Sequence, residues 1–134
     1  MIHVETTVNA DAQKVWNYFT DPAHIINWYF ASDDWHAPKA ENDLQVHGKF
    51  KTNMAAKDGS FAFDFEGSYT KVEPITGIEY KIIDGRKVII TFSVSGDEVT
   101  VKESFEAENQ NSEELQQQGW QAILNNFKKY VEAN

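Results

Sequence analysis

Few residues in this chain could carry acid–base chemistry, and Glu103 is the first of them. It shares the parity of Val101 and Phe105 in an alternating segment, so it would point to the same apolar face and could act as a pocket acid. Alternatively, the segment has already opened to water at this point. We favour this second interpretation, because glutamate is almost never buried without a partner.

The histidines give no sign of a metal site. Metal sites need several convergent ligands, and the spacing of the imidazoles does not supply them. We therefore expect four surface histidines, namely His3, His24, His36 and His47. The chain contains no cysteine and none of the usual glycine-rich phosphate loops, nucleophile elbows or metalloprotease signatures. The sequence predicts no catalytic residue, no metal and no cofactor.

The charge balance of the chain limits the kinds of partner that we expect. The formal net charge is −9, and Arg86 is the only arginine, so nucleic acid is not an expected partner. No apolar run is long enough to span a membrane. The first residues show neither the basic nor the apolar part of a signal peptide. We expect a soluble cytoplasmic protein.

The elements needed to position any site can be derived from hydrophobic periodicity. At 134 residues, we expect a single α+β domain covering residues 1–134. Residues 2–8 alternate as in a half-buried strand, and an amphipathic helix follows Asn9, a plausible N-cap. A second short helix is expected from Pro22, a residue that suits the first position of a helix.

The middle of the chain predicts a sheet. From about residue 35 to residue 106 the period is two, and turn signals recur, which indicates a six-stranded antiparallel meander. In its longest strand the apolar parity shifts between Phe65 and Val72. Gly67 lies between them, so we expect a bulge there and a strongly curved sheet.

The last element is a long helix from Asn111, with Glu114 as the partner in a capping box, through Val131. Its apolar residues cover an arc of about 200°, wider than the stripe of about 100° that a flat sheet needs. A concave sheet should therefore embrace it. Gln116 and Asn126 fall inside this arc, where either a backbone partner or a wet cavity would satisfy their amides. Gly119, also in the arc, indicates either a close contact or room for a ligand.

This order of elements resembles the helix-grip fold of the START and birch-pollen-allergen superfamily (SRPBCC). Spaced motifs sharpen the resemblance to the family of activator of heat-shock protein 90 ATPase homologues. They are Val15-Trp16-x-x-Phe19-Thr20-Asp21-Pro22, Gly48-Lys49-Phe50, Phe65-Glu66-Gly67, Val72-Glu73-Pro74 and Gly119-Trp120. The resemblance implies a deep pocket between sheet and terminal helix, and relatives that bind apolar small molecules. The family's eukaryotic co-chaperones carry an additional N-terminal domain, for which this chain has no room.

Strand parity, the apolar arc of the helix and the aromatic rings that carry a polar group together predict a cavity wall with the following members: Trp28, Phe50, Met54, Phe63, Phe65, Tyr80, Phe92, Gln116, Gly119, Trp120, Ile123 and Phe127. The leading hypothesis is non-catalytic binding of an apolar or aromatic small molecule such as a lipid, polyketide or flavonoid, oriented by Tyr80, Gln116 and Trp120. The second is a stress-related interaction module that binds a chaperone ATPase or a second copy of the chain. The third is a cyclase- or hydrolase-type enzyme with Glu103 or His47 as general base.

Overall fold

The computed structural model describes all 134 residues as one curled sheet with three helices. The helices are α1 (Ala12–Thr20), α2 (Pro22–Ile25) and α3 (Glu113–Ala133). The strands are β1 (Ile2–Val8), β2 (Trp35–Asn42), β3 (Lys49–Ala56), β4 (Ala62–Glu73), β5 (Gly77–Ile82), β6 (Lys87–Ser95) and β7 (Glu98–Phe105). This element order is the α+β architecture that the sequence predicts.

The sheet is antiparallel throughout and has the strand order β1-β7-β6-β5-β4-β3-β2. The predicted meander of six strands corresponds to β2 through β7. The sheet has seven strands rather than six, because β1 pairs along its whole length with β7, from Ile2 opposite Phe105 to Val8 opposite Val99.

The bulge in β4 lies three residues beyond its predicted position. The β4–β5 register shifts between Tyr69 and Lys71, whereas Gly67 pairs regularly with Ile82. Gly67 serves close packing instead. A Cβ added there would lie 2.3 Å from the backbone oxygen of Lys81 and 2.9 Å from the Phe50 ring.

Two helix caps also differ from the sequence prediction. The side chain of Asp11, not Asn9, caps α1 by accepting from the Lys14 N–H at 3.0 Å. Ser112, not Asn111, caps α3 by accepting from the Leu115 N–H at 3.1 Å. In both cases the cap lies closer to the first helical turn, where a side-chain oxygen reaches the third free N–H.

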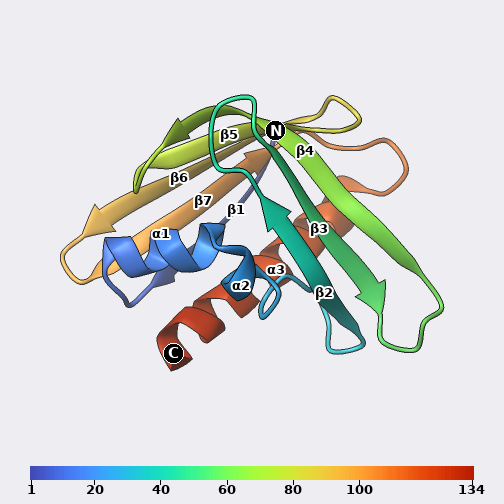
Figure 1. Ribbon diagram of the computed structural model, residues 1–134, viewed down its shortest axis with the longest axis horizontal. Coiled ribbons are helices and arrows are strands. Elements are labelled where there is room, and N and C mark those ends of the chain that lie inside the picture. Colours follow the sequence, from blue (N-terminus) through green and yellow to red (C-terminus); the bar gives the residue numbers. More distant parts are fainter.

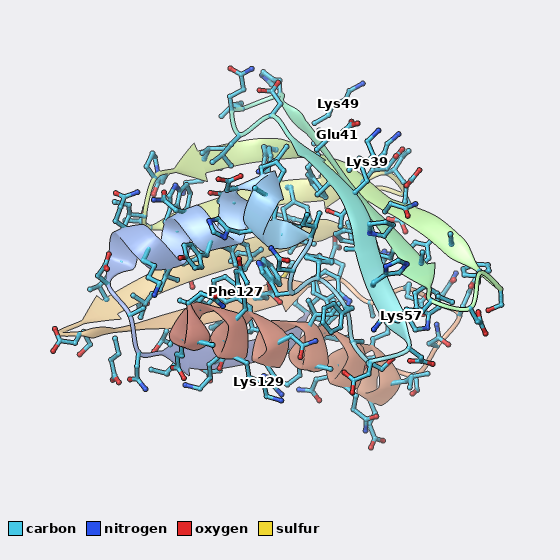
Figure 2. All side chains as sticks on the ribbon, turned by 60° about the horizontal axis from the view of Figure 1, so that its bottom comes forward. Lys39, Glu41, Lys49, Lys57, Phe127 and Lys129 are labelled. Carbon is cyan, nitrogen blue, oxygen red and sulfur yellow. The ribbon has the colours of Figure 1, made fainter.

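Figure 1 shows the sheet curling around α3, whose C-terminal part lies beside α1. Phe127 points from α3 into the interior and Lys129 points outward (Figure 2). The Phe127 ring is completely buried, with its centroid 5.1 Å from that of Phe19 and 4.7 Å from that of Trp28. None of the three helices has the length and apolarity required to cross a bilayer.

Candidate functional site

Two cavities adjoin on the face of the sheet that the helices cover. The outer cavity, of about 280 Å³, lies between the N-terminal half of α3 and the strands β3 and β4. The inner cavity, of about 40 Å³, lies deeper, among α1, α2 and the centre of the sheet. Tyr29, Phe65 and Glu103 line both, so the two spaces meet at these three side chains.

Most of the predicted wall residues lie along these cavities. The outer cavity is lined by Met54, Phe63, Phe65, Gln116, Gly119, Trp120 and Ile123. The inner cavity is lined by Trp28, Phe50, Phe65 and Tyr80. These side chains come from β3, β4, β5, α3 and the turn after α2, which the sheet curvature brings to a common space.

Phe92 and Phe127 line neither cavity and belong to the core. Phe92 packs edge-on against Trp16 and Phe19, with ring centroids 5.4 and 5.3 Å apart. Phe127 faces Phe19 from the other side. Strand parity and helical phase correctly predicted that both rings point inward. They do not show whether an inward-pointing ring meets a cavity or is covered by other aromatic rings.

Gly119 and Gln116 show two different uses of the apolar arc of α3. A Cβ at Gly119 would meet no atom within 4 Å, so this glycine leaves room and makes no close contact.

The buried Gln116 amide is fully partnered. Its oxygen accepts from the Glu108 N–H at 2.9 Å, and its NH₂ donates to the Asn111 carbonyl at 2.9 Å. Gln116 therefore fixes the loop before α3, as the backbone-partner alternative expected.

Glu103 is buried, and the interpretation that it opens to water is wrong. It is 8% exposed and lies in mid-sheet, opposite Val4 of β1 and Ile90 of β6. That interpretation failed because Glu103 lies in mid-sheet among Tyr29, Phe65 and Tyr80, which are distant in sequence and which local parity does not reveal. Burial raises the pKa of the Glu103 carboxyl to about 8, so the group is mostly protonated at neutral pH.

Three tyrosine hydroxyls share the inner cavity with Glu103. Burial is the main cause that raises the pKa of Tyr29, Tyr69 and Tyr80, so all three remain neutral. The Tyr69 hydroxyl donates to Oδ1 of Asn42 at 2.5 Å. Sequence reasoning missed Tyr29 and Tyr69. The one available signal was for Tyr29, which directly follows Trp28 in the segment that reaches the inner cavity.

The histidines lie away from both cavities. Nδ1 of His3 is 2.7 Å from the Ser104 hydroxyl, and Nδ1 of His24 is 2.8 Å from the Tyr130 hydroxyl. His47 is exposed in the loop before β3, with a φ of 72°, so it cannot serve as the general base of a reaction in either cavity. No group of three or more histidine or carboxylate side chains is arranged to hold a metal ion.

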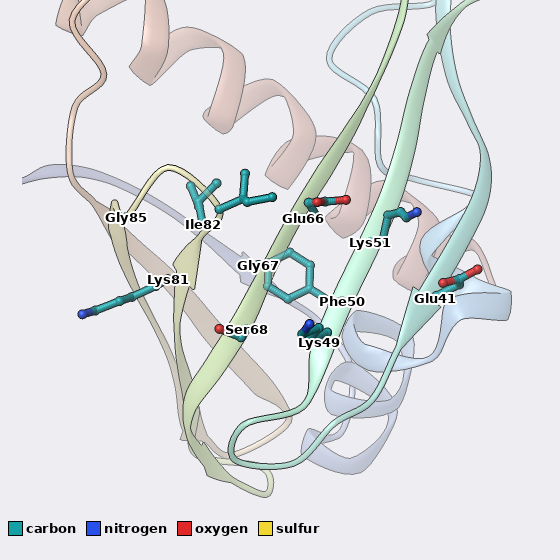
Figure 3. A pocket seen from close by; sticks show the side chains of 11 residues that line it. Glu41, Lys49, Phe50, Lys51, Glu66, Gly67, Ser68, Lys81, Ile82 and Gly85 are labelled. Atoms are coloured by element: carbon teal, nitrogen blue, oxygen red, sulfur yellow. The ribbon is translucent and has the colours of Figure 1, made fainter.

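A third hollow, of about 650 Å³, lies on the other side of the sheet over β3, β4 and β5 (Figure 3). Its wall is mostly charged or polar and includes Lys49, Lys51 and Lys81. Phe50 lines this hollow as well as the inner cavity, and its ring packs beside Gly67. Phe50 is the one aromatic side chain that lines both spaces.

A curled antiparallel sheet, two short helices and a C-terminal helix enclosing cavities define a helix-grip domain of the START-like (SRPBCC) class. The family described as "Activator of Hsp90 ATPase homolog 1-like protein" matches residues 9–132, and the chain belongs to that family. None of the curated proteins matches the chain.

Solved structures agree with this assignment. The solution structure of an AHSA1-like protein from Aeromonas hydrophila is 41% identical, with a TM-score of 0.90 over 98% of this chain and 93% of that one. A protein from Cytophaga hutchinsonii is 56% identical, with a TM-score of 0.85 over 99% of this chain and 92% of that one. A protein from Chromobacterium violaceum has the same fold at 21% identity, with a TM-score of 0.84 over 99% of this chain and 98% of that one.

Proposed function

We propose that this protein binds an apolar or aromatic small molecule, of the lipid, polyketide or flavonoid kind, without altering it chemically. The observation that carries this proposal is the outer cavity of about 280 Å³ between α3 and the sheet. A dry protein cavity of about 150 Å³ accepts a benzene ring, so this space suits one or two rings or a short alkyl chain.

The wall of the outer cavity has the composition of a ligand site. Seven of its thirteen lining residues are apolar or aromatic, and polar or charged groups lie among them, a combination that can bury an apolar body and orient it. Apolar burial contributes roughly 25 cal/mol per Å² and would supply most of the affinity. Met54 gives the wall an adaptable side chain, and the Trp120 indole supplies a flat apolar face beside Gly119.

The test is an NMR titration with neutral apolar probes, namely 2-phenylethanol, 1-octanol and flavanone. We expect shifts in the amide signals around Met54, Phe65 and Gly119. Gly119→Leu should fill the outer cavity and weaken binding at least tenfold. Gln118→Leu, which places the same side chain on the exposed face of α3, is the matched control. If no probe shifts these signals, or if both variants bind equally well, the proposal fails.

A second candidate is acid–base catalysis of the cyclase or hydrolase kind by Glu103. The observation that favours it is a buried carboxyl, with a pKa of about 8, at the junction of the two cavities. Such a group could donate or accept a proton near neutral pH. Product analysis after incubation with polyketide-like and ester substrates would test it, and a reaction retained by Glu103→Gln would exclude this role.

A third candidate is docking to a chaperone ATPase or to a second copy of the chain. It is favoured by exposed aromatic side chains near the β3–β4 turn, where the Phe61 and Phe63 rings lie about 6 Å from each other and from Trp35. Exposed apolar clusters of this kind often mark interfaces. An ATPase assay with a purified bacterial chaperone, together with sedimentation of the chain alone, would test it. Unchanged turnover and a monomeric mass would exclude it.

A further inference from the structure

The inner cavity and its junction with the outer cavity hold side-chain oxygen atoms that have no hydrogen-bond partner in the protein. Every fully enclosed polar side-chain atom has a hydrogen-bond partner. The side-chain oxygens of Glu103, Tyr29 and Tyr80 make no hydrogen bond within the protein, so they must border open space, and the cavities they line provide it. The carboxyl of Glu103 is more than nine-tenths buried and still faces that space.

The inner cavity beside this junction is lined by aromatic rings. Rings of Trp28, Tyr29, Phe50, Phe65 and Tyr80 line the inner cavity together with Glu103. Their centroids are closely spaced, with Phe50 4.7 Å from Tyr80 and Trp28 5.1 Å from Tyr29. The π-face of an aromatic ring attracts a cation, most strongly where water is excluded.

No positively charged side chain forms an ion pair with the Glu103 carboxyl. Arg86 is the only basic residue along either cavity, and its Nε donates to Oδ2 of Asp84 at 2.9 Å. The other ionisable groups along the two cavities are acidic or phenolic: Glu41, Glu108 and the tyrosines Tyr29, Tyr69 and Tyr80. A positive charge brought by a ligand would therefore meet an unpaired carboxyl and several π-faces.

We propose, building on the proposed binding function, that Glu103 recognises ligands in which a protonated amine is attached to an apolar or aromatic body. The body lies in the outer cavity against Trp120 and Gly119, and the ammonium group donates to the Glu103 carboxylate at the junction. The Tyr29 and Tyr80 oxygens offer it two further acceptors. A carboxylate ligand would face Glu103 and Glu108 here and could pair only with Arg86, whose Nε already donates to Asp84.

Amine recognition also predicts a proton-linked signature. In the free protein the carboxyl is mostly protonated at pH 7, because its pKa is about 8. Pairing with an ammonium group requires the carboxylate, so binding should release most of one proton at this pH. Neutral ligands leave the carboxyl protonated and release none.

The experiment compares 2-phenylethylamine, 2-phenylethanol and phenylacetate by calorimetric titration at pH 7, in phosphate and in Tris. We expect the amine to bind at least tenfold more tightly than the alcohol, with a buffer-dependent enthalpy that corresponds to proton release. Phenylacetate should bind most weakly. In Glu103→Gln the preference for the amine and the proton release should both disappear, while the alcohol still binds. Glu98→Gln, the same charge change at an exposed site on β7, should keep both.

The outcomes separate this inference from the binding function on which it rests. Binding of the alcohol without preference for the amine, or an amine preference that survives in Glu103→Gln, would overturn the role of Glu103 alone. Failure of all three compounds, and of octanol and flavanone, would overturn both proposals. Because glutamine closely mimics the protonated acid, Glu103→Gln is expected to fold, and its near-UV circular dichroism verifies this before the titrations.

Discussion

The two halves of α3 face the same sheet but form different kinds of interface. The C-terminal half inserts Leu124, Phe127 and Val131, each at most 1% exposed, into a continuous core. The N-terminal half presents Gly119 and Ile123 to the outer cavity. One helix therefore supplies a packed anchor at one end and a cavity wall at the other, so its stabilising and ligand-facing residues can be changed separately.

The two halves of α3 form different interfaces because they contact different side chains. The C-terminal half meets the Phe19 and Trp28 rings, which fill the space beneath it. In the N-terminal half the Trp120 indole stacks on Phe105, with centroids 3.8 Å apart. This large ring pair spans helix and sheet beside a residue without a side chain, Gly119. The Trp120–Phe105 pair fills the distance between α3 and the sheet, and Gly119 beside it has no side chain to fill the remaining space.

The largest expected effect is in the packed half. Phe127→Ala should lower the free energy of unfolding by about 3 to 5 kcal/mol, because it removes a completely buried ring and leaves a void. Met54→Ala, which shortens a half-buried side chain on the outer cavity, should cost about 1 kcal/mol or less. Urea titrations of both variants measure the difference. Similar losses would mean that the two halves are packed alike.

The sequence was sufficient for the order of the elements and for the inward direction of most of the expected wall residues, because strand parity and helical phase are local properties. It was insufficient for Glu103, whose burial depends on side chains distant in sequence, among them Tyr29 and Phe65. It was also insufficient for Phe92 and Phe127, where other rings decide whether an inward side chain meets a cavity. A local sequence pattern predicts the direction in which a side chain points. Whether that side chain meets a cavity or another ring depends on contacts that are distant in sequence.

Glu103 provides the next test, at the junction of the two cavities. Its pKa is raised to about 8 from 4.5, so between these values the folded chain holds a proton that the unfolded chain has lost. The free energy of unfolding should therefore fall as the pH rises from 5 to 8, by a few kcal/mol. In Glu103→Gln this contribution is absent, so the decline should be shallower and the variant should be more stable than the natural chain at pH 8. Urea titrations across this pH range measure both curves, and parallel curves would contradict the assignment.

Gly67 tests the close packing of β4 against β5 and the Phe50 ring. Gly67→Ala would place a methyl group 2.3 Å from the Lys81 carbonyl oxygen and against the Phe50 ring, so backbone must move. We expect a loss of about 1 to 3 kcal/mol in the free energy of unfolding. Gly59→Ala is a useful contrast, since its cost would come from a φ of 79° and not from a clash. If Gly67→Ala has the same midpoint of thermal unfolding as the natural chain, then β4 and β5 can separate here without cost.

Gly119 gives the smallest effect and the opposite sign. A Cβ at this position meets nothing within 4 Å, and the residue lies inside a regular helix, so Gly119→Ala should stabilise the chain by up to about 1 kcal/mol. The same substitution in a packed interface would overfill it and destabilise the protein. A gain in thermal stability, with 2-phenylethanol binding little changed, is expected if the N-terminal half of α3 stands clear of the sheet. A loss would mean that the helix approaches the sheet in solution and that the outer cavity closes when no ligand is bound.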